Sequence, residues 1–137
     1  MRLSKTSEYA IRILTYMASD KDNMFNANEI IRKLKISDKY LRKLMTKLSK
    51  AGFTKSIQGR NGGYVFNKPT NEIFLIDIID AVEGIDTYMG CVLGFDHCSD
   101  DNPCVMHSKW KGIREEFFKV FKNTSLAEFS TTEKQKF

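Results

Sequence analysis

Cysteine, histidine and proline are scarce in this sequence of 137 residues, which contains three, two and two of them respectively. With no C-x-x-C pair and no nucleophile–base motif, the chain lacks the usual signs of catalysis. No apolar run approaches the roughly 20 residues that a membrane-spanning helix needs, and the N-terminus has no signal-peptide pattern. We therefore expect a cytoplasmic protein that is not an enzyme and has no membrane partner.

The few cysteines are crowded into one segment. Cys91, Cys98 and Cys104 are followed by His107, and no other cysteine occurs. Three thiolates gathered in this way suit iron–sulfur, zinc or thiol redox chemistry. Structural disulfides are not expected, because they are rare in a reducing compartment. Since Cys104 and His107 are three residues apart near an expected helix start, both can face one point. These four residues are the candidate metal ligands.

Three chemistries compete for this cysteine segment. Structural zinc sites usually contain a tight C-x₂₋₄-C pair, whereas six and five residues separate the cysteines here. We favour an iron–sulfur cluster, either 2Fe-2S or 4Fe-4S, and retain a thiol–disulfide switch and a zinc site as alternatives. Because exposed cysteine sites are vulnerable to oxygen, we expect such a cluster to be lost during aerobic purification.

Charge divides the chain into two unequal halves. Residues 1–70 carry 15 Lys and Arg against 5 Asp and Glu, a net +10, whereas residues 71–137 carry 7 against 12, a net −5. A basic half is expected of a domain that binds a polyanion. We therefore predict a DNA-binding domain over 1–70 and a second, acidic part over 71–137.

Three amphipathic helices are predicted in the basic half. The first spans about residues 7–18, Asn26 begins the second, and the third lies between Ser37 and Gly52, which suit a helix start and a helix end. The short connection between the second and third helices is typical of a helix-turn-helix. The positions that follow the helical period and are expected to be buried are Ala10, Ile13, Leu14, Met17, Ala27, Ile30, Ile31, Leu34, Leu41, Leu44, Met45 and Leu48.

A β-hairpin is predicted directly after the third helix. Residues 53–58 and 64–67 read as short strands around a glycine-rich turn, in which Asn61 and Gly62 are expected to take positive φ angles. A hairpin in this place is the wing of a winged helix, and Arg60 at its tip is positioned to reach a phosphate or a narrow minor groove. A nucleotide-phosphate loop is disfavoured, because no Gly-Lys-Ser/Thr follows the glycines.

The acidic half begins with a short helix over about 75–82, which Gly84 ends. An irregular segment over 85–104 carries the cysteines, and a long helix over 104–122 follows Pro103. The length of the irregular segment indicates a functional loop. An apolar stripe on the long helix exceeds what one short chain can cover, which suggests a partner helix. Its members are Trp110, Ile113, Phe117, Val120 and Phe121.

The C-terminal end of the sequence carries one further helix-start signal. Ser125 followed by Glu128 resembles a capping box for a final short turn. Residues 131–137 are expected to form a frayed tail.

The sequence also resembles a known family. The opening segment 1–12, the turn 36–41 and the wing 59–64 are similar to those of the Rrf family of bacterial winged-helix regulators, which includes iron–sulfur sensors of the IscR and NsrR types. The resemblance covers roughly residues 1–130. It implies a fold that is mainly α with a small β-hairpin, namely a winged helix-turn-helix domain plus a long C-terminal dimerisation helix. It also implies a homodimer that binds a palindromic operator.

The family pattern assigns roles to the cysteine segment. Cys91, Cys98 and Cys104 match its cluster cysteines, and His107 matches the histidine ligand of the IscR type. The gap between Cys91 and Cys98 is one residue longer than the five residues usual in IscR-like members. Glu8 matches a carboxylate ligand supplied by the partner subunit in some NsrR-like members, so it is a rival fourth ligand. Its alternative role is a favourable charge in the first turn of a helix.

The family also places the start of the third helix in the major groove of DNA. The residues expected to reach bases are Ser37, Lys39, Tyr40 and Arg42, although Tyr40 also suits a half-buried core position. Lys43, Lys47 and Arg60 are expected to contact phosphates or the minor groove. The sequence thus predicts a transcription factor that senses redox, iron–sulfur or nitric oxide status. An iron–sulfur electron carrier is disfavoured, since it needs neither a lysine-rich helix nor a wing.

Overall fold

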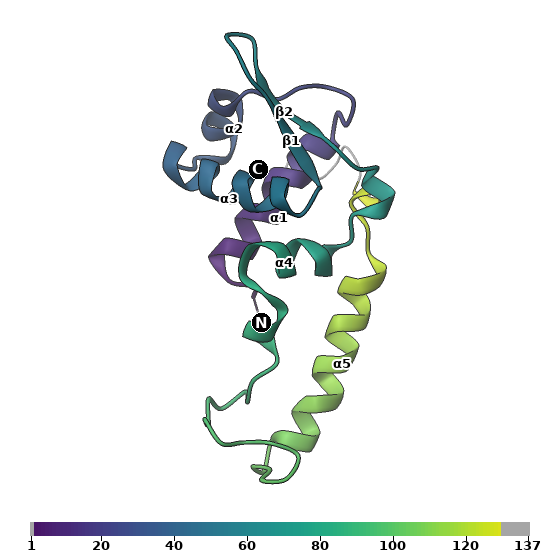
Figure 1. Ribbon diagram of the computed structural model, residues 1–137. Helices are drawn as coiled ribbons and strands as arrows, with labels where there is room; N and C mark the ends of the chain where they lie inside the picture. Colours follow the sequence, from purple (N-terminus) through teal and green to yellow (C-terminus); the bar gives the residue numbers. More distant parts are fainter. Residues whose placement is uncertain (1, 130–137) are drawn as a thin grey trace.

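The computed structural model of the chain describes residues 2–129 (Figure 1). The fold is mainly helical with one two-stranded antiparallel sheet, as predicted. The expected tail over 131–137 lies outside the described residues. The helices and strands are α1 (Lys5–Ala18), α2 (Ala27–Leu34), α3 (Asp38–Lys50), β1 (Thr54–Ile57), β2 (Gly63–Phe66), α4 (Leu75–Glu83) and α5 (His107–Asn123), with short 3₁₀ turns η1 (Thr70–Glu72), η2 (Ile85–Tyr88) and η3 (Leu126–Glu128).

Side-chain caps set the starts of the first three helices. The Asn26 side chain accepts a hydrogen bond from the Glu29 backbone N–H at 2.8 Å, and the Ser37 hydroxyl accepts one from the Tyr40 backbone N–H at 3.2 Å. Each cap satisfies one of the free amide groups at a helix start. Ser4 caps α1 in the same way, so this helix begins two residues before the predicted start.

The core lies where the helical period places it. α1 and α4 pack against each other, and α3 packs against α2 and α4. The predicted apolar positions of α1 and α3 are all buried, whereas Ala27 and Ile31 of α2 are only partly buried. α4 buries Leu75, Ile78, Ile79 and Val82. The apolar side chains of α1 and α3 that are at most 1% exposed are Ala10, Ile13, Leu14, Met17, Leu41, Leu44, Met45 and Leu48.

The predicted hairpin is present, but its turn differs from the prediction. β1 pairs with β2 from Thr54↔Phe66 to Ile57↔Gly63. Gly59 takes the positive φ angle, at 107°, whereas Asn61 and Gly62 do not. The Gly62 N–H donates to the Gly59 carbonyl oxygen at 3.1 Å. The turn therefore lies one residue earlier in the sequence than the Asn61-Gly62 pattern predicted.

Gly62 is nevertheless required in the turn for a different reason. A Cβ atom at this position would overlap the Ile57 carbonyl oxygen. The close approach of the two strands, rather than a left-handed backbone, therefore explains this glycine.

The acidic half begins as predicted and departs from the prediction near the cysteines. α4 ends at Glu83, and the predicted stop, Gly84, is its C-cap with a φ of 82°. α5 begins at His107 rather than at Cys104. The Cys104 N–H donates to the Cys98 sulfur. Cys104 therefore belongs to the irregular loop, and the helix begins three residues later.

The far end of α5 returns to the core. The Ser125–Glu128 capping box is present, with the Ser125 N–H donating to the Glu128 carboxylate at 2.7 Å. Phe121 packs against the core. In contrast, Ile113 and Val120 are 55% and 59% exposed. α5 therefore carries the uncovered apolar surface that the sequence predicted.

The two candidate functional regions lie far apart. Figure 1 shows the tip of the hairpin at one end of the molecule and the irregular loop between η2 and α5 at the other. No helix within residues 2–129 is long and apolar enough to cross a membrane.

Candidate metal centre and nucleic-acid interface

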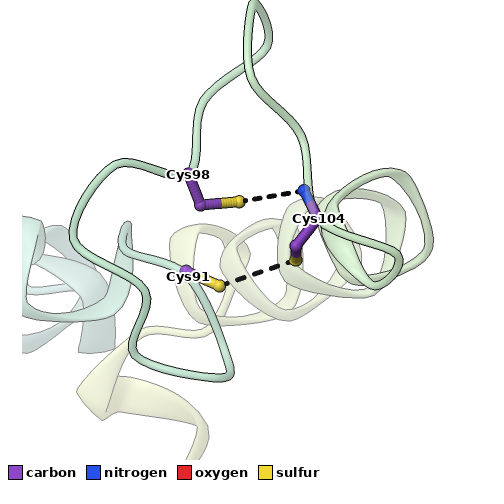
Figure 2. A group of neighbouring side chains, drawn as sticks. All are labelled: Cys91, Cys98 and Cys104. Carbon is purple, nitrogen blue, oxygen red and sulfur yellow. Dashed lines mark hydrogen bonds between the residues drawn. The ribbon is translucent and has the colours of Figure 1, made fainter.

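The three cysteine side chains meet at one point (Figure 2). Their sulfur atoms all lie within 4.8 Å of one another. The Cys91 and Cys104 sulfurs are 3.7 Å apart and form no disulfide, and the Cys98 sulfur accepts the Cys104 backbone N–H at 3.5 Å. Three soft donors at such distances suit a soft metal ion or an iron–sulfur cluster. The residues present therefore fit the predicted cofactor.

The thiols differ in how readily they lose a proton. A hydrogen bond from the backbone of Phe95, together with weaker ones from Leu93 and the neighbouring thiols, lowers the pKa of Cys91 to about 7. The pKa of Cys98 is raised: the Cys104 backbone N–H alone lowers it, but burial and the adjacent thiols outweigh that effect. Because thiolates are the metal-binding form, Cys91 is better prepared for binding than Cys98.

His107 stands beside this sulfur group at the first position of α5. Its Nδ1 atom lies 3.4 Å from the Cys98 sulfur, and its Nε2 atom lies 2.8 Å from a carboxylate oxygen of Asp100. The His107 side chain is only 18% exposed. The structure therefore brings the predicted histidine to the three cysteines, in contact with one of them.

Glu8, the rival ligand, has a different environment in this chain. Its carboxylate pairs with Arg2 at 3.1 Å, Lys5 at 3.3 Å and Arg12 at 3.9 Å. Partial burial by itself raises the pKa of Glu8, but the Lys5 hydrogen bond and the nearby positive charges lower it overall. Within residues 2–129, Glu8 does not join the sulfur group. It occupies the first turn of α1, where a negative charge is favourable.

A second side chain of α5, Arg114, binds the backbone just before Cys91. The Arg114 Nη1 atom donates to the Met89 carbonyl oxygen at 2.8 Å and to that of Gly90 at 3.4 Å. A cavity of about 70 Å³ lies between this anchor and the sulfurs, lined in part by Trp110. Sequence reasoning missed both Arg114 and Asp100, because neither lies in a motif and their contacts depend on the fold of an irregular loop.

The basic surface lies on α3 and the hairpin. Ser37, Lys39, Arg42 and Lys43 are exposed on α3 or at its cap, and Arg60 is exposed near the hairpin tip. Arg42 and Arg60 line the same hollow, of about 330 Å³, between α3 and the hairpin. The structure thus brings together predicted DNA contacts from two separate motifs.

Arg42 has a partner within its own helix. It donates to both Asp38 carboxylate oxygens, at 3.0 and 2.9 Å. Since both side chains are more than half exposed, this pair is weak in water, and Arg42 can exchange Asp38 for a base or phosphate at low cost.

Two of the predicted DNA contacts are held by the protein itself. The Tyr40 hydroxyl donates to the Thr6 hydroxyl at 3.3 Å, and its ring packs edge-on against Tyr9. The Lys47 ammonium donates to the Val82 carbonyl oxygen at 2.8 Å, which links α3 to the end of α4. Lys43 and Arg60 are therefore better placed than Lys47 to contact phosphate.

Comparison with known proteins gives a consistent result. Residues 3–132 match the Rrf2 family, described as "Iron-dependent Transcriptional regulator". The chain is 33% identical to an HTH-type transcriptional regulator from Aquifex aeolicus (98% of this chain, 95% of the relative). It is 30% identical to the HTH-type transcriptional regulator NsrR from Oceanobacillus iheyensis (98% and 93%).

Solved structures agree with the sequence comparison. The chain is similar to CymR, the global cysteine regulator of B. subtilis, with a TM-score of 0.75 and 26% identity over 92% of this chain and 93% of that one. It shares its fold with T. potens IscR, with a TM-score of 0.71 and 24% identity over 100% and 89%. On its matched length, its winged helix and its similarity to named regulators, this chain belongs to the Rrf2 family of transcriptional regulators.

Proposed function

We propose that this protein is a homodimeric DNA-binding regulator whose affinity for a palindromic operator depends on an iron–sulfur cluster held by Cys91, Cys98 and Cys104. The observation that carries this proposal is the convergence of three sulfurs within 4.8 Å in a chain whose other end presents a basic helix and hairpin. Such a cluster supplies a change of charge and coordination when its redox state or ligands change.

In this proposal the chain has two functional parts. Residues 1–70 bind DNA, and residues 71–137 hold the cluster and the partner subunit. Within the second part, loop 85–104 carries the cysteines. α5, which begins at His107, takes the role predicted for a helix over 104–122.

His107 is the fourth ligand that the chain's own geometry favours. Its Nδ1 atom already lies beside the Cys98 sulfur, whereas three cations neutralise Glu8 within the same chain. A Glu8 ligand from the partner subunit would have to give up these pairs.

At the other end, the start of α3 enters the major groove. Ser37, Lys39 and Arg42 contact bases, and a bidentate contact from Arg42 to guanine gives about 1–3 kcal/mol of discrimination. Tyr40 joins them through its hydroxyl, which must first leave the Thr6 hydroxyl, while its ring stays packed on Tyr9. The phosphate and minor-groove contacts come from Lys43, Lys47 and Arg60, of which Lys47 must first leave the Val82 carbonyl.

DNA binding by anaerobically purified protein tests this function. Duplexes selected from a random pool supply the operator, and the dissociation constant is measured for loaded protein and for protein stripped with a chelator. We expect the two constants to differ by at least about fivefold, the lower end of typical allosteric coupling.

The matched control replaces all three cysteines with alanine. This variant should remain folded and bind the operator with one affinity before and after chelation. If wild-type protein binds the operator equally well loaded and stripped, the sensor proposal is wrong. If no duplex is selected, the DNA-binding proposal is wrong.

A thiol–disulfide switch is the second candidate, favoured by the 3.7 Å separation of the Cys91 and Cys104 sulfurs. It predicts iron-free protein in which oxidation changes operator affinity and reductant restores it. The variant Cys98→Ala separates the two functions, because it removes a cluster ligand and leaves the Cys91–Cys104 pair intact.

A further inference from the structure

Asp100 makes a contact for which the proposed function does not account. Its carboxylate oxygen lies 2.8 Å from the Nε2 atom of His107, and the Nδ1 atom of the same ring lies 3.4 Å from the Cys98 sulfur. The imidazole therefore stands between a carboxylate on one side and the sulfur group on the other.

The loop holds Asp100 in this position through its own hydrogen bonds. The backbones of Ser99 and Asn102 exchange hydrogen bonds at 3.1 and 3.2 Å, which closes a tight turn around Asp100. The Asn102 side chain donates to the His97 carbonyl oxygen at 3.0 Å. Lys111, one turn along α5 from His107, also contacts the Asp100 carboxylate, at 3.4 Å.

The contact determines which nitrogen of His107 carries the proton. A carboxylate can only accept, so it requires a hydrogen on Nε2. In the neutral ring the Nδ1 atom then has a free lone pair, and this atom faces the Cys98 sulfur. Metal-binding histidines commonly donate their second ring N–H to a carboxylate, which fixes the tautomer and the ring orientation.

We infer that Asp100 is a positioning residue for the metal centre, which holds His107 as its Nε2–H tautomer with Nδ1 presented to the three thiolates. This inference rests on the proposed function for its metal, but the tautomer is a property of the metal-free chain. Asp100 itself does not belong to the sulfur group in the described part of the chain, so it acts through His107.

The competing interpretation is an ordinary surface ion pair, since the Asp100 side chain is 74% exposed. The neighbouring Asp101 provides the matched control. It is also exposed and makes no side-chain hydrogen bond or ion pair within residues 2–129. Asp100→Ala and Asp101→Ala therefore remove the same charge from the same loop, and only the first removes the contact.

The first experiment uses reduced, metal-free protein labelled with ¹⁵N-histidine. Long-range ¹H–¹⁵N spectra, recorded at a pH where the rings are neutral, report the tautomer of each ring. The chain has only two histidines, so His107→Ala assigns the signals and the exposed His97 serves as the internal reference. We expect His107 to be almost wholly Nε2–H in the wild type and in Asp101→Ala. In Asp100→Ala its tautomer ratio should move to that of His97.

The second experiment follows the visible absorbance of the loaded protein in the presence of a chelator. Loss of an outer partner of a ligand commonly costs 10–100-fold in metal affinity, so Asp100→Ala should lose absorbance roughly 10-fold faster than the wild type. Asp101→Ala should match the wild type. In a His107→Ala background, adding Asp100→Ala should change nothing further, because Asp100 acts only through the ring.

The outcomes separate this inference from the proposed function. A wild-type His107 tautomer ratio equal to that of His97, or an unchanged ratio in Asp100→Ala, overturns the inference. So does an equal effect of Asp100→Ala with and without His107. If the wild-type chain takes up no iron, the proposed function fails, and the tautomer measurement still decides whether Asp100 sets the state of His107.

Discussion

At the scale of single residues, lysines on one helix have different tasks. Lys43 is exposed on α3, whereas the Lys47 ammonium donates to the Val82 carbonyl oxygen at 2.8 Å. The sequence marks both only as basic positions of a DNA-binding helix. The structure makes Lys47 a link between α3 and α4, so the two residues should respond differently to substitution.

We predict that Lys47→Ala lowers the free energy of unfolding by about 1 kcal/mol, the usual contribution of one hydrogen bond. Lys43→Ala should change it by less than about 0.5 kcal/mol, as is usual for surface positions. Urea unfolding at matched protein concentration measures both. Equal stability of Lys47→Ala and wild type would show that the Val82 contact contributes nothing.

Lys43 and Arg60 give a prediction for the salt dependence of DNA binding. Lys43→Ala should reduce the slope of log affinity against log salt by about 0.9, the effect of one phosphate contact. Arg60→Ala should do the same from the hairpin. An unchanged slope for Lys43→Ala would remove this residue from the interface.

At the scale of elements, the periodic parts of the fold could be predicted from the sequence and the irregular parts could not. The burial of Ala10, Ile13, Leu14 and Met17 follows directly from helical spacing. The start of α5 differs from the prediction because the Cys104 N–H donates to the sulfur of Cys98, six positions earlier in the loop, and no local pattern encodes that contact.

The cysteine site divides in the same way. Cys91, Cys98 and Cys104 could be predicted as candidate ligands from the sequence, because few other residue types bind soft metals. The contacts of Asp100 and Arg114 depend on turns and carbonyl positions in a loop without periodicity. Such contacts appear only once the loop has a structure.

The hairpin turn gives a prediction at this scale. Gly62→Ala should lower the free energy of unfolding by about 1–3 kcal/mol, the range for mutations that force a steric rearrangement, because the added Cβ would overlap the Ile57 carbonyl oxygen. Asn61→Ala should be nearly neutral, since Asn61 has no positive φ. Thermal unfolding distinguishes them, and equal losses for the two variants would contradict this description of the turn.

At the scale of the whole molecule, α4 connects the two ends. It packs against α1, α3 and α5, and η2 continues from it towards the cysteine loop. The Ser4 N–H donates to the Tyr88 hydroxyl at 3.1 Å, so the start of α1 also contacts η2. The cysteine loop is therefore linked to α1 and α3 through a continuous chain of contacts that runs by way of η2 and α4. These contacts are a structural route by which a change in the loop could alter the helices of the basic half.

The uncovered surface of α5 predicts self-association. The double substitution Ile113→Lys and Val120→Lys should convert a dimer into a monomer, because it places two charges in an apolar interface. Val105→Lys is the control, since Val105 is 76% exposed but lies outside α5. Analytical ultracentrifugation measures the mass, and a monomeric wild type or a dimeric double variant would contradict the homodimer proposal.

The central claim is that the three thiols hold an iron–sulfur cluster, and elemental analysis tests it most directly. Iron, acid-labile sulfide and zinc are measured in protein purified without oxygen, together with the visible spectrum. We predict iron and sulfide in equal amounts, with thiolate-to-iron absorption, in the wild type and neither in the variant with all three cysteines replaced by alanine. Zinc, or no metal at all, in the wild type would contradict the claim.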